Sequence, residues 1–131
     1  MLTLKSFSSL MLCIALGAIA GCGGTGPQNC GPVGLNVTPT TVTADHVAAP
    51  PANSQTFSAA FQFSSNPGCP AVTAALVNSN WTVSDPSVHL SAPQATQVTA
   101  TCTAAITTPA TITATPVSGE MFTGRASLTC N

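Results

Sequence analysis

Short runs of alternating apolar and small polar residues recur along the chain from residue 33 onward. The alternating positions are Val33, Leu35 and Val37; Phe57, Ala59, Phe61 and Phe63; Trp81 and Val83; Val98, Ala100 and Cys102; Ala110, Ile112 and Ala114; and Phe122, Ala126, Leu128 and Cys130. Such alternation places one set of side chains on a single face, which predicts half-buried β-strands. Pro39 ends the first run, and we expect irregular structure over 44–54, 64–79 and 103–109, with no helix. The pattern predicts an all-β protein, with about seven antiparallel strands in a two-sheet β-sandwich.

The composition agrees with a strand-rich domain that carries little charge. Only 4% of the residues are charged, and the net charge is −1. Thr and Val, which favour strands, are abundant, whereas Glu, Lys and Arg are nearly absent. Beyond residue 21 the ionisable side chains, apart from cysteine, are Asp45, His46, Asp85, His89, Glu120 and Arg125. Because they form no basic patch, we expect no nucleic-acid partner.

The N-terminal segment is organised like an export signal. Lys5 is followed by an apolar stretch over residues 7–20, which is shorter than the roughly 20 residues of a membrane-spanning helix and suits a signal peptide. The stretch leads into Ile19-Ala20-Gly21-Cys22, which resembles the lipobox of bacterial lipoproteins. The resemblance implies cleavage between Gly21 and Cys22 and a lipid on the Cys22 thiol. The alternative is an ordinary secretory signal with a coincidental cysteine.

These features divide the chain into three parts. We expect a lipoprotein signal peptide over 1–21, a lipid-anchor cysteine and flexible tether over 22–32, and one domain over 33–131. The stretch 23–29 spans at most about 25 Å when fully extended. The expected partner is therefore a membrane of the bacterial cell envelope, held through the lipid on Cys22. Gly23 is not the Asp that signals inner-membrane retention, so the outer membrane is favoured, with the domain in the periplasm or at the cell surface.

The domain is similar to the bacterial immunoglobulin-like domains of group 2. The segments that carry the resemblance are Leu35-Asn36-Val37-Thr38-Pro39, Trp81-Thr82-Val83-Ser84-Asp85-Pro86-Ser87-Val88, Val98-Thr99-Ala100 and Ala110-Thr111-Ile112-Thr113-Ala114-Thr115. The resemblance covers residues 33–130 and implies an immunoglobulin-like sandwich without catalytic residues. The chain departs from the family pattern in a longer 64–79 segment, in the absence of a glycine before Val98, and in four added cysteines.

Those four cysteines follow Cys22. We expect them to form disulfides, because the cysteines of an exported domain usually pair when their number is even. They are Cys30, Cys69, Cys102 and Cys130, which allow three pairings. The strand order implied by the resemblance puts the first two at one end of the sandwich and the last two at the other. The resemblance therefore implies the bonds Cys30–Cys69 and Cys102–Cys130. A four-thiolate metal site is the rival interpretation, but no Cys-x-x-Cys pair is present.

The residue types of a hydrolase triad occur, although not in a catalytic motif. Ser87 and His89 share a face if residues 87–89 form a strand, and Asp45-His46 supplies an acid and a second imidazole. No nucleophile elbow or glycine-rich oxyanion segment accompanies them. We therefore interpret His89 as a polar strand residue and Asp85-Pro86 as a turn. Two histidines and three acids are too few to indicate a metal site, and no cofactor is expected.

The sequence thus predicts a non-catalytic, lipid-anchored immunoglobulin-like module with a structural or adhesive role in the cell envelope. The alternative is a module that binds a glycan or an envelope protein through the 64–79 segment, since loops on a rigid sandwich are common binding sites. Trp81 is expected in the core rather than as an exposed platform for a sugar.

Overall fold

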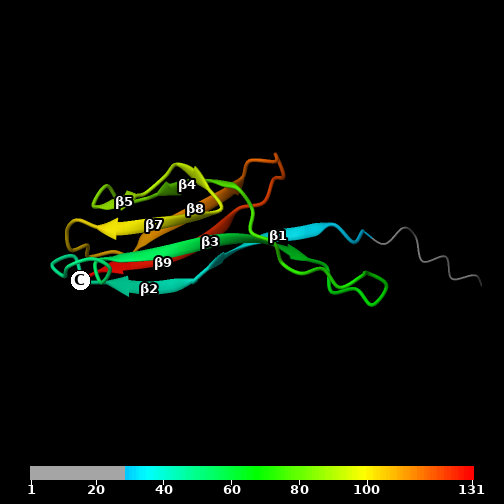
Figure 1. Cartoon of the computed structure of the whole chain (residues 1–131), viewed down its shortest axis with the longest axis horizontal. Helices are drawn as coiled ribbons and strands as arrows, with labels where there is room; N and C mark the ends of the chain where they lie inside the picture. Colours follow the sequence, from blue (N-terminus) through cyan, green and yellow to red (C-terminus); the bar gives the residue numbers. More distant parts are fainter. Residues whose placement is uncertain (1–28) are drawn as a thin grey trace, which may run out of the picture.

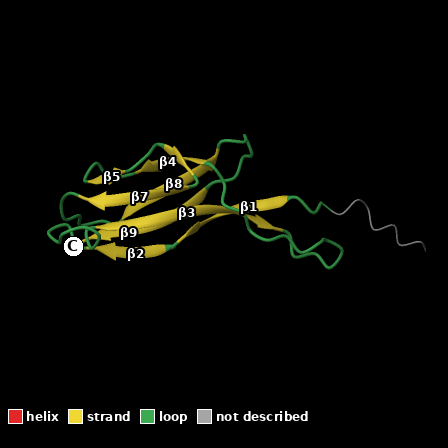
Figure 2. Cartoon of the chain, viewed as in Figure 1, coloured by secondary structure: helices red, strands yellow, loops and turns green. Residues whose placement is uncertain are grey.

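The computed structural model describes residues 29–131, so the predicted signal peptide, Gly21, Cys22 and most of the predicted tether lie outside the described residues. Within that range the protein contains strands and loops and no helix (Figure 2). Nine strands follow one another: β1 (Pro32–Thr38), β2 (Thr41–Ala44), β3 (Ser54–Phe63), β4 (Ser79–Val83), β5 (Val88–Leu90), β6 (Gln94–Ala95), β7 (Gln97–Cys102), β8 (Ala110–Pro116) and β9 (Gly124–Cys130).

The strands form two sheets that pack into a β-sandwich (Figure 1). One sheet has four strands in the order β1-β3-β7-β5, and the other has five in the order β2-β9-β8-β4-β6. This confirms the predicted all-β, two-sheet architecture. The count of nine differs from the expected seven because β2, β5 and β6 have only four, three and two residues. Strands this short carry too few residues to show a clear alternation.

The pair β2–β9 is parallel, whereas the prediction made every strand antiparallel. The cause lies in the connection between β1 and β2, which consists of Pro39 and Thr40 alone. Across these two residues the chain keeps its direction (Figure 1) and passes from the four-stranded sheet, where β1 pairs antiparallel with β3, to the five-stranded sheet, where β2 pairs parallel with β9. The segment 41–44 forms an edge strand, so the predicted irregular range 44–54 is wrong at its first residue, Ala44.

The predicted inward positions form the core between the two sheets. Phe57, Ile112 and Leu128 are fully buried, and Trp81 is 3% exposed. The other buried apolar residues are Leu35, Val37, Ala44, Ala59, Val77, Val88, Val98, Ala100, Cys102, Ala110, Ala114, Ala126 and Cys130. Thr residues cover the opposite faces, as in the cross-strand pair Thr56–Thr99, whose hydroxyl oxygens lie 3.1 Å apart. Neutral hydroxyl groups therefore face the solvent on the outer sides of the sheets, where most domains have charged side chains.

Four apolar residues of the predicted buried face are exposed or only half-buried near one end of the sandwich, and one of them, Phe122, lies in the loop before β9 rather than on that strand. Val33 is 52% exposed because the β1–β3 register shifts between Pro32 and Gly34. Phe61 and Phe63 are only half-buried, since β7 pairs with β3 no further than Ser58. Beyond Ser58, β3 extends past the end of β7. The rings of Phe61 and Phe63 are therefore not fully covered.

The two ends of the sandwich carry different loops (Figure 1). We call one the β1 end; it holds the start of β1, the segment 64–78 and the loop 117–123. The opposite C-terminal end holds Asn131 and the loops 45–53, 84–87 and 103–109. Cys30 is bonded to Cys69 and Pro32 begins β1, so the last residues of the predicted tether, 30–32, are held to the domain.

Candidate functional site

The segment 64–78, which connects β3 to β4, is the longest connection between consecutive strands. It is fixed near its middle by the disulfide Cys30–Cys69, whose Cα atoms lie 5.3 Å apart. Nearer β4, the Val77 N–H donates to the Ala59 carbonyl oxygen at 2.8 Å, and Leu76 forms an isolated bridge with Ala60. The segment is therefore tied at Cys69 to Cys30, just before β1, and at residues 76–77 to β3, and the chain between these points forms one wall of a pocket.

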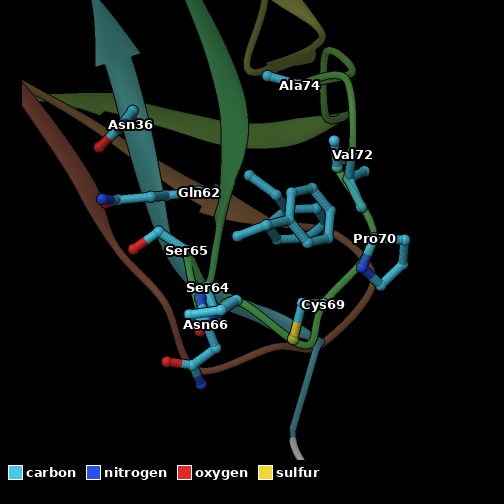
Figure 3. A pocket seen from close by; sticks show the side chains of 13 residues that line it. Asn36, Gln62, Ser64, Ser65, Asn66, Cys69, Pro70, Val72 and Ala74 are labelled. Atoms are coloured by element: carbon cyan, nitrogen blue, oxygen red, sulfur yellow. Dashed lines mark hydrogen bonds between the residues drawn. The ribbon is translucent and has the colours of Figure 1, made fainter.

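This pocket has a volume of about 570 Å³ and lies between the segment and the end of β3. Figure 3 shows Val72, Pro70 and Cys69 on the segment at one side, and Gln62 and Asn36 on the strands with their side chains directed to the other side. The remaining lining residues are Phe61, Phe63, Ser64, Ser65, Asn66, Pro67, Ala71 and Ala74. Phe61 and Phe63 meet edge to face, with ring centroids 6.4 Å apart. The volume falls within the range of about 300–1,000 Å³ typical of small-molecule sites.

No charged side chain lines the pocket within the described part of the chain. Its polar groups are the amides Asn36, Gln62 and Asn66 together with serine hydroxyls, and the remainder is apolar or aromatic. Amides and hydroxyls can both donate and accept hydrogen bonds, but they offer no ion pair to a carboxylate or a phosphate. The arrangement therefore suits a neutral ligand with an apolar face.

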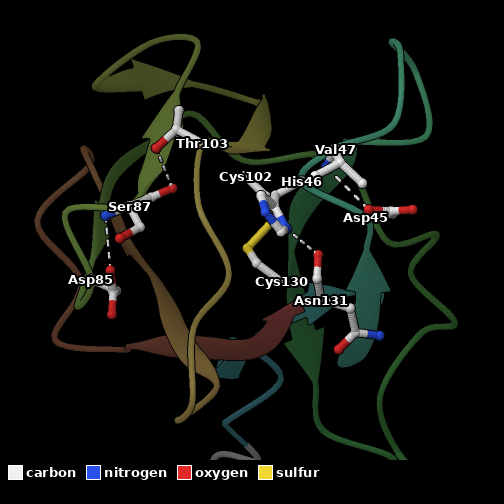
Figure 4. Close-up of a disulfide and its surroundings, with 9 residues drawn as sticks. All are labelled: Asp45, His46, Val47, Asp85, Ser87, Cys102, Thr103, Cys130 and Asn131. Atoms are coloured by element: carbon white, nitrogen blue, oxygen red, sulfur yellow. Dashed lines mark hydrogen bonds between the residues drawn. A yellow bond between two sulfur atoms is a disulfide. The ribbon is translucent and has the colours of Figure 1, made fainter.

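The second disulfide, Cys102–Cys130, closes the C-terminal end (Figure 4). It joins the last residues of β7 and β9, one from each sheet, and both cysteines are 1% exposed. The two disulfides join the same cysteines as the pairing implied by the family resemblance. Beside this bond, the backbone N–H of His46 lies 3.0 Å from the Asn131 carbonyl oxygen, and the His46 Nδ1 atom contacts the same oxygen.

The candidate catalytic residues are separated rather than assembled. Asp85 and Ser87 lie on one side of the Cys102–Cys130 disulfide, and Asp45 and His46 lie on the other (Figure 4). The Asp85 carboxylate accepts the Ser87 backbone N–H at 2.8 Å, which closes the turn expected at Asp85-Pro86. His89 is exposed on β5. Within residues 29–131, no hydrogen bond joins the Ser87 hydroxyl to an imidazole, so these residues fit turn and strand roles.

Trp81 is a core residue, as expected. Its ring is 3% exposed, and its Nε1–H donates to the Ala95 carbonyl oxygen at 2.9 Å. The indole thus packs between the sheets while its one polar group is satisfied, as a buried tryptophan requires. Trp81 presents no face to a sugar.

The pocket depends on residues whose role the sequence pattern did not reveal. Phe61 and Phe63 were assigned to an inward strand face, but alternation does not report where the covering sheet ends. Val72 lies in a segment without periodicity, and its position depends on the Cys30–Cys69 bond. The two cysteines were the available signal, since a bond between them draws the segment against the start of β1.

In the described part of the chain, no three or more His, Cys, Asp or Glu side chains gather where they could hold a metal ion. A search of the same residues finds no helix with the length and apolar character to cross a membrane. Comparisons with protein-family models, with curated proteins and with solved structures found no match.

Proposed function

We propose that the chain is a lipid-anchored immunoglobulin-like module of the bacterial cell envelope, with a structural or adhesive role and no catalytic activity. The observation that carries the proposal is the order of features along the chain: a lipobox-like Cys22, a short tether, and then a sandwich with two disulfides. Disulfides persist in oxidising compartments outside the cytoplasm. The bonded cysteines thus support export independently of the N-terminal signal.

The strand order supports the immunoglobulin-like assignment. Immunoglobulin sandwiches have strands A, B, E and D in one sheet and C, F and G in the other. Here β1-β3-β7-β5 corresponds to A-B-E-D, and β4, β8 and β9 correspond to C, F and G. Trp81 lies on β4, the strand that buries a tryptophan in antibody domains. The chain departs from that pattern because Cys102–Cys130 joins β7 to β9 and because the sequence contains no tyrosine.

Two observations support a non-catalytic role. The pocket lining lacks a nucleophile–base pair, because its hydroxyl groups belong to Ser64 and Ser65 and no histidine lines it. The two histidines lie at or near the C-terminal end, on different elements, without a hydrogen bond to Ser87 in the described residues. General acid–base chemistry requires such groups within hydrogen-bond reach of a substrate.

Metabolic labelling with a radioactive fatty acid tests the anchor. We expect label on the wild-type protein and on Cys13→Ala, a matched control that changes the other N-terminal cysteine. Cys22→Ala should carry none, because it lacks the sulfur that forms the thioether. Label on Cys22→Ala equal to that on the wild type would contradict the proposal.

A second candidate function is binding of a neutral glycan or an envelope protein through the segment 64–79. The pocket favours it, because its wall combines aromatic rings with amides and excludes charge. Val72→Trp should fill the pocket and reduce capture of a binding partner in glycan-array and envelope pull-down assays. Val47→Trp, at the opposite end, is the control. Equal capture by both variants would exclude this pocket as the binding site.

A further inference from the structure

Large apolar side chains that face solvent are concentrated at the β1 end. Met121 is the most exposed of them at 99%, and it lies in the loop 117–123. The others at this end are Val33, Val72, Leu76 and Val117. Among the described residues, the remaining exposed large apolar side chain is Val47, on the C-terminal end. Scattered exposed apolar residues are ordinary on proteins, but a gathering at one end marks an interaction surface.

Aromatic packing fixes the loop 117–123, which carries Met121 and Val117, to β3. Phe61 contacts Phe63 on β3 and Phe122 in the loop 117–123, with ring centroids 6.4 Å apart in both pairs. Phe63 also lines the pocket together with Val72. The half-buried Phe122 thus fixes its loop to β3, while the adjacent Met121 remains in solvent. Both loops of the β1 end are therefore packed against β3 or its aromatic side chains, and each carries exposed apolar side chains.

The two ends differ in the sign of their charged side chains rather than in their number. Asp45, His46 and Asp85 lie in loops of the C-terminal end, and His89 lies on the adjoining strand β5. At the β1 end the described charged side chains are Glu120, which accepts the Ser118 hydroxyl, and Arg125, in the second position of β9. With histidine neutral, the formal charges sum to −2 at the C-terminal end (Asp45 and Asp85) and to 0 at the β1 end (Glu120 and Arg125). A lipid surface with anionic headgroups therefore repels the C-terminal end more than the β1 end.

The length of chain before the domain places the same end close to the anchor. Seven residues, 23–29, separate Cys22 from Cys30, and they span at most about 25 Å. Cys30 is bonded to Cys69 at the β1 end, so the tether cannot move along the sandwich. A lipid on Cys22 therefore holds the apolar end, rather than the C-terminal end, near the membrane surface.

We infer that the β1 end rests on the lipid surface, with Met121, Val72 and Val117 in the interfacial region of the bilayer. This inference rests on the proposed lipid anchor, adds an orientation to it, and is an alternative to the second candidate function, because Val72 lines the pocket which that function requires. One lipidated cysteine supplies the attachment, and the apolar side chains supply a second, weaker contact of the kind that interfacial segments make. The loops 45–53, 84–87 and 103–109 then point away from the membrane, where an envelope partner can reach them.

Fluorescence quenching by brominated lipid tests the orientation on the full lipidated protein. Trp81 is the single tryptophan and is buried, so the wild type gives an unquenched baseline. Met121→Trp and Val47→Trp place a second indole at the two ends, each at an exposed site. In vesicles of phosphatidylethanolamine and phosphatidylglycerol that contain brominated chains, we expect loss of the added emission for Met121→Trp and no loss for Val47→Trp.

Equal quenching of both variants, or of neither, would overturn the inferred orientation. Intact mass of the same samples separates this failure from failure of the anchor. If Cys22 carries lipid and Met121→Trp remains unquenched, the orientation is wrong and the anchor stands. If Cys22 carries no lipid, the proposed function is wrong and the orientation falls with it.

Discussion

Gly124 lies directly against Val37, at the point where β9 of one sheet passes β1 of the other. A Cβ atom on Gly124 would come within 2.8 Å of the Val37 Cγ2 atom and 2.9 Å of the Leu35 carbonyl oxygen. Distances this short lie below ordinary van der Waals contact, and one of the two opposing atoms belongs to the backbone. The close approach of the two sheets at this point therefore requires a residue without a side chain.

Gly124→Ala should consequently destabilise the domain. We expect a loss of about 1–3 kcal/mol in the free energy of unfolding, the usual effect of an added methyl group in a packed core. Chemical denaturation of both proteins measures the difference. Gly34→Ala is the control, because its nearest neighbour would be the Gln62 Oε1 atom at 3.5 Å, an ordinary contact. Equal stability of Gly124→Ala and the wild type would contradict the close approach.

The two disulfides should differ in their contribution to stability. Their sequence separations are 39 for Cys30–Cys69 and 28 for Cys102–Cys130, and the chain-entropy model assigns each about 4 kcal/mol. The second pair is also buried in the core, so its replacement by alanine leaves unfilled space. The double variant C102A/C130A should therefore lose more stability than C30A/C69A, although it opens the shorter loop. Thermal unfolding of the two double variants would contradict this if their order were reversed.

Asp85 and Asp45 form a matched pair of turn carboxylates. Asp85 accepts the part-buried Ser87 N–H at 2.8 Å, and Asp45 accepts the exposed Val47 N–H at 3.0 Å. Asp85→Ala leaves a less hydrated donor unpaired, so we expect a loss of about 1–2 kcal/mol in the free energy of unfolding, and less for Asp45→Ala. Urea denaturation at neutral pH measures both. A larger effect at Asp45 would show that burial does not set the importance of these turns.

Much of the fold could be predicted from periodicity. The alternating positions on β7, β8 and β9 are buried where the pattern placed them, as are Phe57 and Ala59 on β3, and Trp81 lies in the core. These strands are long enough for alternation to be visible, and each has one covered face. The strands β5 and β6 were missed because three and two residues carry no period. The parallel β2–β9 pair was missed because strand direction depends on tertiary path, which periodicity does not report.

The candidate binding site could be predicted only in outline. The segment 64–79 stood out by its length, and the resemblance implied the Cys30–Cys69 bond that holds it. The partial exposure of Phe61 and Phe63 could not be predicted, since it results from where β7 stops along β3. The exposure of Met121 likewise depends on the neighbouring Phe122, which packs on Phe61 and holds the loop in place.

The central claim is that a lipidated cysteine anchors a sandwich with two internal disulfides. Intact mass of the mature protein, purified from membranes and measured before and after reduction, tests it most directly. The account predicts a chain that begins at Cys22 and carries acyl chains, and that gains two hydrogens for each of its two disulfides on reduction. An unlipidated chain with a different first residue, or a mass unchanged by reduction, would contradict the account.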